Sequence, residues 1–314
     1  VAAASIFMAV KNGYQAAMMA PTEILAQQHA EYLSGLFNPL GITTAFLTGS
    51  MRAKEKREAL SRIASGEVCV VIGTHALIQE SVEFKSLGFV VADEQHRFGV
   101  EQRAKLMAKG ENPHMLIMSA TPIPRTLALI LYGDLDISVI DELPPGRKPV
   151  KTYAVNSKTR SRVYNFIEEN VRNGMQAYVV CPLVAETEKS DLENAEMLAR
   201  KLRESYPHMR VGLMHGKMKA KEKDKTMSEF VSGDIDVLVA TTVIEVGVNV
   251  PNANIMAIEN AERFGLSQLH QLRGRVGRGE HSSYCILVSD NKSEDSAKRL
   301  SVMCTTTNGF VIAD

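Results

Sequence analysis

Short apolar runs alternate with amphipathic stretches along most of the chain. In the first half, the apolar runs are compact and bounded by polar or small residues, whereas the stretches between them repeat apolar positions at helical spacing. The pattern predicts strands at Gln15–Ala20, Thr44–Leu47, Val68–Ile72, Phe89–Ala92 and Met115–Ser119, and helices at Ile24–Phe37 and Lys54–Ala64. Buried strands that alternate with helices are typical of a parallel sheet covered on both faces.

The pattern breaks at Asp141–Pro149 (DELPPGRKP), where three prolines and a glycine cannot continue a helix or a strand. It then resumes, with strands predicted at Ala177–Cys181, Val211–Met214, Val237–Ala240, Ile255–Ile258 and Cys285–Val288, and helices at Ser161–Asn173, Asn194–Ser205 and Lys221–Ser232. No short-period repeat interrupts either half. We therefore predict two α/β domains, residues 1–145 and 146–314, with the ligand site in the cleft between them.

Composition narrows the class of protein. Of the 314 residues, 45% are hydrophobic and 23% charged, as in ordinary globular proteins. No apolar run approaches the ~18–20 residues that a transmembrane helix needs. The 36 basic residues equal the 36 acidic ones, which excludes a polybasic DNA coat but not a protein that contacts nucleic acid through a few groups.

Cysteine usage indicates the compartment. Cys69, Cys181, Cys285 and Cys304 are far apart and lie in or near apolar runs, with no CxxC pair. We predict buried, reduced thiols in a cytoplasmic protein. Val1–Ala4 has no basic flank, so no signal peptide is expected.

Two adjacent carboxylates form the first candidate site. The predicted strand Phe89–Ala92 ends in Asp93 and Glu94, and His96 follows shortly after. Parallel sheets bind ligands at the carboxyl ends of their strands. One carboxylate can hold Mg²⁺ largely through water, and the next can orient an attacking water. A solvated loop after a strand is the alternative interpretation.

A second strand end carries hydroxyls. Ser119 and Thr121 follow the strand at Met115 and could hydrogen-bond the acidic pair or His96. The alternative is a helix cap before Pro122.

Arginines and glycines alternate in Gln271–Arg278 (QLRGRVGR). Arg275 and Arg278 are three positions apart, so on a helical turn they would project from one face. Two guanidinium groups there would stabilise charge developing on a transferring phosphoryl group. A structural salt-bridge cluster is the alternative.

Several loops combine small residues with hydroxyls. Ala20–Glu23 places Thr22 before a predicted helix, where free N–H groups and a hydroxyl can hold a phosphate. Thr48–Ser50, Gly73–His75 and Thr241-Thr242 have the same character. Such contacts position a nucleic-acid strand without reading its sequence. Plain caps and turns are the alternative for each loop taken singly.

In combination and in order, these segments resemble the motifs of a superfamily 2 helicase with two RecA-like domains. Ala20–Glu23 resembles motif Ia, Asp93–His96 motif II, Ser119–Thr121 motif III, Ala240–Pro251 motif V and Gln271–Arg278 motif VI. The resemblance covers nearly the whole chain and implies two parallel sheets flanked by helices.

Within that superfamily the chain is similar to the RecG family of bacterial ATP-dependent helicases, which remodel branched DNA. Four segments carry this similarity: DEQHRFGV at 93–100, SATPIPRT at 119–126, DELPPGR at 141–147, and the stretch at 259–279. The related translocase Mfd, which acts in transcription-coupled repair, shares much of this pattern. Gln95 and DELPPGR favour RecG. A nucleic-acid-binding module that does not hydrolyse ATP remains open.

The resemblance implies ATP and Mg²⁺ as cofactors, with Asp93 binding Mg²⁺ through water and Glu94 polarising the hydrolytic water. It implies that Arg275 and Arg278 are arginine fingers. Gln271 is a further candidate catalytic residue, and His96, Gly247 and Asn249 are candidates near the nucleotide, although many relatives have Asp in place of Asn249. The candidates for DNA binding and coupling are Thr22, Glu23, Thr48, Gly49, Thr74, His75, Ser119, Thr121, Thr241 and Thr242.

The phosphate-binding loop GxxxxGK[ST] does not occur in the sequence. In the family this loop precedes the helix that Val1–Val10 resembles, so we expect the chain to begin just after motif I. We also expect these 314 residues alone to hydrolyse ATP poorly. The expected partners are branched or double-stranded DNA and a single-stranded DNA-binding protein, for a monomer that does not contact a membrane.

Overall fold

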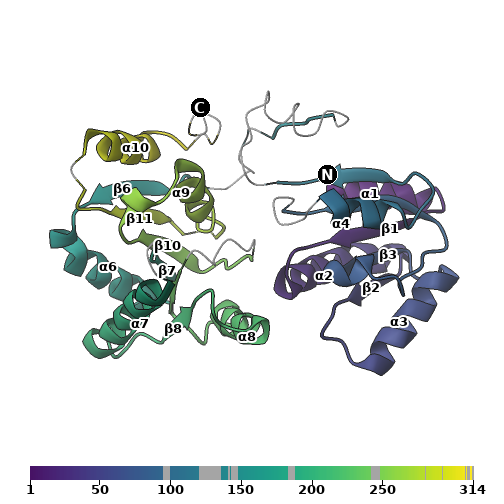
Figure 1. Ribbon diagram of the computed structural model, residues 1–314, viewed down its shortest axis with the longest axis horizontal. Coiled ribbons are helices and arrows are strands. Elements are labelled where there is room, and N and C mark those ends of the chain that lie inside the picture. The colour runs from purple at the N-terminus through teal and green to yellow at the C-terminus, as the bar shows by residue number, and fades with distance from the viewer. Residues whose placement is uncertain are drawn as a thin grey trace. The chain divides into compact units, whose positions relative to one another are not determined.

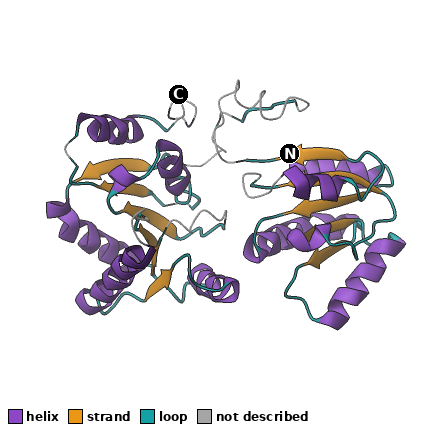
Figure 2. Ribbon diagram, in the orientation of Figure 1, coloured by secondary structure: helices purple, strands orange, loops and turns teal. Residues whose placement is uncertain are grey.

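A computed structural model describes residues 1–94, 100–119, 136–140, 142, 148–182, 188–241, 248–279, 281–291, 293–307, 309 and 312. The chain forms two compact units, and the division between them follows residue 120 (Figure 1). Each unit is a parallel sheet with helices on both faces, as the sequence predicts (Figure 2).

The first unit has a five-stranded sheet in the order β2-β3-β1-β4-β5. Its elements are α1 (Ala2–Lys11), β1 (Gln15–Met19), α2 (Glu23–Phe37), β2 (Thr44–Leu47), α3 (Ala53–Ser65), β3 (Val70–Gly73), β4 (Leu87–Ala92), α4 (Val100–Met107) and β5 (His114–Ile117). Ile6 of α1 and Leu33 of α2 pack on one face of the sheet. Ile63 of α3 and Leu106 of α4 pack on the other. Burial of both faces explains the nearly uninterrupted apolar strands.

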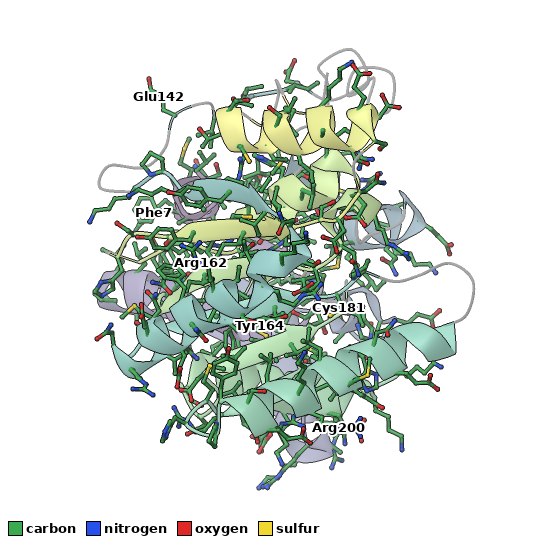
Figure 3. All side chains as sticks on the ribbon, turned by 90° about the vertical axis from the view of Figure 1, so that its left-hand side faces the viewer. Phe7, Glu142, Arg162, Tyr164, Cys181 and Arg200 are labelled. Atoms are coloured by element: carbon green, nitrogen blue, oxygen red, sulfur yellow. The ribbon has the colours of Figure 1, made fainter. Side chains whose placement is uncertain are left out.

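The second unit has a six-stranded sheet in the order β6-β11-β10-β7-β9-β8. Its elements are β6 (Lys151–Val155), α6 (Arg160–Arg172), β7 (Gln176–Val180), α7 (Glu188–Ser205), β8 (Val211–Met214), α8 (Ala220–Val231), β9 (Val237–Ala240), β10 (Ala253–Ile258), α9 (Leu266–Arg273), β11 (Tyr284–Val288) and α10 (Glu294–Thr305). Ile167 of α6 and Leu202 of α7 pack on one face, in a core that also contains Tyr164 and Cys181, both labelled in Figure 3.

The strands predicted from the sequence are present, but the elements β6, α4 and α10 were not predicted. Strand β6 is an edge strand with mostly exposed side chains, so it lacks the apolar run that marks the other strands. Helix α4 has only 8 residues, and α10 has 12 residues that are mostly polar. The prediction of four buried thiols is confirmed for Cys181 and Cys285 and wrong for Cys304, which is exposed on α10; Cys69 is half-buried.

The two units contain a duplicated substructure that is visible in the sequence at a separation of 167 residues. Residues 48–56 read TGSMRAKEK and residues 215–223 read HGKMKAKEK, which are identical at six of nine positions. In both copies the segment follows a strand, and a helix begins at its sixth residue, Ala53 or Ala220. A methionine sulfur accepts a backbone N–H bond in each, from Thr48 to Met51 and from His215 to Met218.

Two core hydrogen bonds also repeat, with their acceptors at the same separation and their donors, Gln15 and Gln176, 161 residues apart. In unit 1 the buried side chain of Gln15 donates to the carbonyls of Ile63 and Val68. In unit 2 Gln176 donates to Phe230 and Ile235, which are the 167-residue equivalents of those two residues. The two units therefore share their backbone fold and the hydrogen bonds of one buried glutamine. Residues at equivalent positions can be compared directly.

Candidate functional site

Asp93 lies at the carboxyl end of β4. Its backbone N–H donates to the carbonyl of Met19, the last residue of β1. One carboxylate oxygen, Oδ1, accepts from the N–H of Glu94 at 3.0 Å. The other, Oδ2, lies 2.8 Å from Nε2 of His29, on α2. The side chain of Asp93 remains 18% exposed, so both oxygens are fixed while the group still reaches solvent.

Glu94 is held in an uncommon conformation. Its φ is 53°, in the left-handed region that non-glycine residues rarely adopt, and only 7% of the residue is exposed. Such strain persists only where surrounding structure enforces it, and it clusters at functional sites. In the sequence, Glu94 is a candidate site residue because it is adjacent to Asp93. Its backbone conformation is a second and independent indication.

Unit 2 carries a carboxylate at the equivalent strand end. Glu259 follows β10, and its N–H donates to Val180, the last residue of β7, as Asp93 does to Met19. Here the carboxylate is closed off: Arg160 donates to both oxygens, and the Tyr164 hydroxyl donates to Oε1 at 2.6 Å. Burial and the Glu259 charge raise the pKa of the neighbouring Cys181 thiol to about 12.

The residues of unit 1 fit a magnesium ion that is held mainly by water and phosphate oxygens. Within the described ranges there is no group of three or more His, Cys, Asp or Glu side chains that could hold a metal by themselves. A carboxylate oxygen has more than one lone pair, so Asp93 can accept a further bond beside those from His29 and Glu94. Mg²⁺ usually keeps several waters and takes one or two protein carboxylates.

Two of the loops predicted to hold a phosphate backbone, Ala20–Glu23 and Thr48–Ser50, meet in unit 1. Thr22 is the N-cap of α2 and accepts from the N–H of Leu25, as predicted. The carboxylate of Glu23 accepts from both the N–H and the hydroxyl of Ser50, at 3.2 Å and 2.5 Å. Glu23 therefore holds the Thr48–Ser50 loop against the start of α2. Gly49 in that loop is exposed.

Thr74 and Thr241 are equivalent residues of the duplicated substructure. Each donates its N–H to the last residue of the neighbouring strand, Leu47 or Met214. Each is 1% exposed, and neither hydroxyl has a hydrogen-bond partner in the described part of the chain. Buried hydroxyls are normally paired, which makes both candidates for contact with a ligand oxygen. The neighbouring His75 is exposed.

The duplication reveals a loop that the sequence reasoning missed. His215–Lys219 in unit 2 is equivalent to Thr48–Arg52, with lysine where unit 1 has Ser50. Lys217 and Lys219 are exposed, and Lys223 closes the loop by donating to the carbonyl of Gly216. The signal was present in the sequence as the match between TGSMRAKEK and HGKMKAKEK, but at a separation that a search for short periods does not detect.

The expectation that Arg275 and Arg278 share a helical turn is wrong. Helix α9 ends at Arg273, and Gly277 has a φ of 82°, which turns the chain between the two arginines. A Cβ at Gly277 would lie 2.8 Å from the side chain of Val150, so the close approach needs glycine. Arg275 is 4% exposed, whereas Arg278 is exposed.

The remaining candidates are dispersed or lie outside the described residues. Gln271 is half-buried on α9, Asn249 is exposed, and Ser119 is exposed just beyond β5. The candidates His96, Thr121, Thr242 and Gly247 lie outside the described residues, as does most of the predicted linker.

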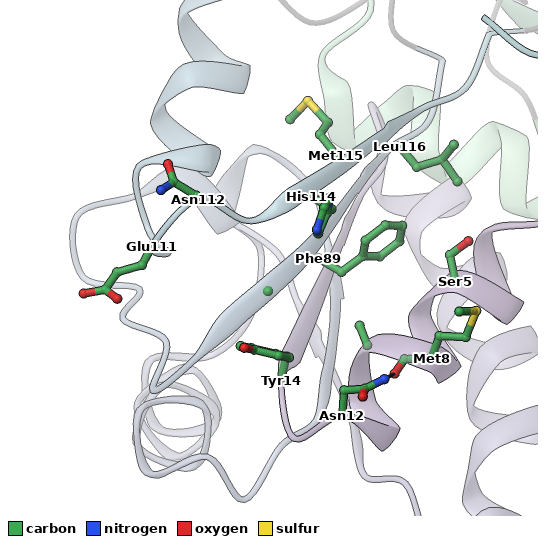
Figure 4. Close-up of a pocket in the computed structure, with 12 residues that line it drawn as sticks. Ser5, Met8, Asn12, Tyr14, Phe89, Glu111, Asn112, His114, Met115 and Leu116 are labelled. Carbon is green, nitrogen blue, oxygen red and sulfur yellow. Dashed lines mark hydrogen bonds between the residues drawn. The ribbon is translucent and has the colours of Figure 1, made fainter. Parts of the chain in front are cut away.

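A pocket of about 650 Å³ lies elsewhere in unit 1, at the opposite end of β4 from Asp93 (Figure 4). Phe89, Met115 and Leu116 of the sheet line it together with Met8 of α1 and Asn12, which follows that helix. None of the candidate residues lines it.

Two family models match the chain. The model for DEAD/DEAH box helicases matches residues 1–130, and that for the helicase conserved C-terminal domain matches residues 158–280. The ATP-dependent DNA helicase RecG of Bacillus subtilis (strain 168) is 52% identical over 315 residues, covering 100% of this chain and 46% of that protein. The chain belongs to the RecG helicase family. It spans about half the length of the curated relatives it matches.

Solved structures agree with this family. A structure of RecG bound to a three-way DNA junction has a TM-score of 0.87 and 47% identity, covering 99% of this chain and 41% of that one. S. cerevisiae Dbp5 bound to RNA and ADP BeF3 has a TM-score of 0.66 at 17% identity, over 93% of this chain and 75% of that one, which shows the shared fold alone. None of the described helices is both long and apolar enough to cross a membrane.

Proposed function

We propose that this chain forms the two motor domains of an ATP-driven helicase that acts on branched DNA. One observation carries the proposal: the fold places a carboxylate at equivalent strand ends in both units, and only Asp93 is left open to a ligand. Glu259 is enclosed by Arg160 and Tyr164, whereas Asp93 meets His29 and the N–H of Glu94. The relatives named as ATP-dependent DNA helicases support this assignment.

In the proposed mechanism, Asp93 would hold Mg²⁺, which when bound would supply charge neutralisation at the nucleotide phosphates. Glu94 orients the attacking water with its carboxylate, and its strained backbone fixes the direction of the side chain. Arg278 is exposed and stabilises charge on the transferring phosphoryl group. We propose the same role for Arg275, with Gln271, His96, Gly247 and Asn249 as further nucleotide-site residues.

The proposed DNA contacts are made to the phosphate backbone. In unit 1 they comprise Thr22, the loop that contains Thr48 and Gly49, and the buried hydroxyl of Thr74 beside His75. In unit 2 they comprise Thr241 and, by the duplication, the loop that contains Lys217. Ser119, Thr121 and Thr242 complete the set. Contacts of this kind position a strand without reading bases, and they require no net positive charge on the whole chain.

We further propose that the protein works as a monomer in the cytoplasm, with a single-stranded DNA-binding protein as a candidate partner. Residues 1–314 contain no GxxxxGK[ST], and we propose that on their own they hydrolyse ATP far more slowly than the natural full-length polypeptide.

The test is ATP hydrolysis by the natural full-length polypeptide, with and without a three-way DNA junction, in parallel with unwinding of that junction. We expect DNA to stimulate hydrolysis, and Glu94→Gln to lower kcat by about a hundredfold or more, because the water loses its orienting carboxylate. Glu111→Gln, which changes an exposed glutamate of the same unit, is the matched control.

The proposal would be contradicted if DNA did not change the rate of ATP hydrolysis, or if Glu94→Gln hydrolysed ATP at the wild-type rate. Junction binding without any hydrolysis would favour the non-hydrolysing binding module instead.

A further inference from the structure

His29 is the side chain that the sequence reasoning did not single out, yet it touches the central carboxylate of the site. Its Nε2 lies 2.8 Å from Oδ2 of Asp93, and the two side chains are 24% and 18% exposed. An ionised carboxylate only accepts hydrogen bonds, so Nε2 carries the proton and donates. The partner for Oδ2 therefore comes from a different element, α2, and not from the chain around Asp93.

The same helix holds the Thr48–Ser50 loop. Glu23, the first residue of α2, binds the N–H and hydroxyl of Ser50. His29 lies six residues further along, which is about 9 Å along the helix axis. Between them the helix is anchored by Leu25 and Ala26, which are buried in unit 1. Both polar contacts are thus made by one short stretch of a single regular helix.

We propose that His29 is a positioning residue that ties Asp93 to α2, so that one rigid helix sets both the metal-binding carboxylate and the Thr48–Ser50 loop. This inference rests on the proposed function. A shift of Asp93 when the nucleotide binds pulls on His29 and moves α2, and Glu23 carries that movement to Ser50. Coupling of this kind is reciprocal, so DNA bound at the loop affects nucleotide binding by the same factor.

The coupling is measured without turnover, from binding of a fluorescent non-hydrolysable ATP analogue with Mg²⁺ to the natural full-length polypeptide. The dissociation constant is determined with and without a three-way DNA junction. We expect the DNA to tighten analogue binding to the wild-type protein, and His29→Leu, which has no donor, to bring that ratio close to one. Titration with Mg²⁺ should show that His29→Leu binds Mg²⁺ about tenfold more weakly than the wild type, because partners of metal ligands affect metal affinity on that scale.

His29→Gln is the decisive second variant, since its side-chain amide still donates a hydrogen bond. We expect it to keep most of the DNA effect and of the Mg²⁺ affinity. Gln27→Ala, which removes an exposed contact to Glu31 on the same helix, controls for general effects on α2. Urea unfolding of each variant separates loss of coupling from loss of stability.

A wild-type DNA effect that His29→Leu retains would overturn the inference and leave the proposed function intact. Failure of His29→Gln to differ from His29→Leu would also overturn it, because the donor would then not be the cause. A wild-type protein that binds neither the analogue nor the junction would overturn the inference and the proposed function together.

Discussion

Asp93 and Glu259 occupy the same place in two copies of one fold, but they have opposite surroundings. Asp93 follows β4 and donates its N–H to the last residue of β1. Glu259 follows β10 and donates its N–H to the last residue of β7. The Glu259 side chain is 7% exposed and neutralised by a bidentate arginine, while that of Asp93 is 18% exposed and contacts His29 and the N–H of Glu94. The duplicated backbone supplies the position, and the partners decide whether the carboxylate binds a ligand or holds the structure together.

The paired loops differ in the same way. In unit 1, the Thr48–Arg52 loop has the neutral Ser50, held by Glu23, where the equivalent loop of unit 2 has Lys217; both loops end in a basic residue, Arg52 or Lys219. Ser50 offers a hydroxyl and an N–H group, and Lys217 adds long-range attraction to phosphate. Both loops are therefore suited to phosphate, one through hydrogen bonds alone at this position and the other through charge as well.

The largest expected effect distinguishes the two carboxylates by activity. Asp93→Asn in the natural full-length polypeptide should lower kcat for ATP hydrolysis by about a hundredfold or more, because the charge that would hold the metal is lost. Its unfolding free energy should change little. Steady-state kinetics and urea unfolding of the same preparation check both parts, and near-normal turnover would remove Asp93 from the site.

Glu259→Gln should show the reverse pattern, with a loss of stability. Arg160 would keep a charge without its carboxylate, and the loss is about 2 kcal/mol, at the low end for a buried pair because Arg160 is 36% exposed. Urea unfolding monitored in unit 2 measures the loss. Glu168→Gln, which breaks the more exposed pair with Arg172, should cost less than about 0.5 kcal/mol. Equal losses in the two variants would contradict the structural role of Glu259.

The loop comparison predicts a smaller effect, on DNA binding. Lys217→Ser, which gives the second loop the residue of the first, should weaken junction binding about fivefold and reduce the slope of log K against log salt by about 0.9. Ser50→Ala should leave that slope unchanged, since no charge is removed. Fluorescence anisotropy at several salt concentrations measures both variants, and identical salt slopes would remove Lys217 from the interface.

The smallest expected effect is on the pH dependence of the stability of unit 2. Burial, with a contribution from Arg273, lowers the pKa of His270 to about 4 from its ordinary 6.5, so His270 is neutral and its Nδ1 accepts from Arg273. Because the folded pKa is depressed, this stability is present above pH 6.5 and is lost as the pH falls toward 4. We expect a loss of about 1 kcal/mol between pH 7 and pH 5, reduced by partial solvation.

His270→Asn keeps an acceptor for Arg273 but does not titrate, so its unfolding free energy should depend less on pH over this range. Urea midpoints at pH 7 and pH 5 for the wild type and the variant provide the measurement. The same pH dependence in both proteins would assign the effect to another group.

The sequence predicted the sheets because strands buried on both faces have to be apolar throughout, which leaves a strong local signal. It failed at β6, where an edge position permits exposed polar residues, and at the mostly polar α10. It also placed Arg275 and Arg278 on one helical turn, since their spacing alone cannot reveal the positive φ at Gly277. The candidate residues at strand ends were found because chemistry there follows directly after an apolar run.

By itself, the sequence determined the family, the two α/β units and the acidic pair Asp93-Glu94, because these are written in contiguous motifs and in local periodicity. Tertiary structure alone decided which carboxylate is open, since the partners of Glu259 come from 99 and 95 residues away. It likewise brought His29 to Asp93 across 64 residues and Glu23 to Ser50 across 27. Hydrogen bonds between distant elements depend on where the sheet places each helix, and no local pattern encodes that placement.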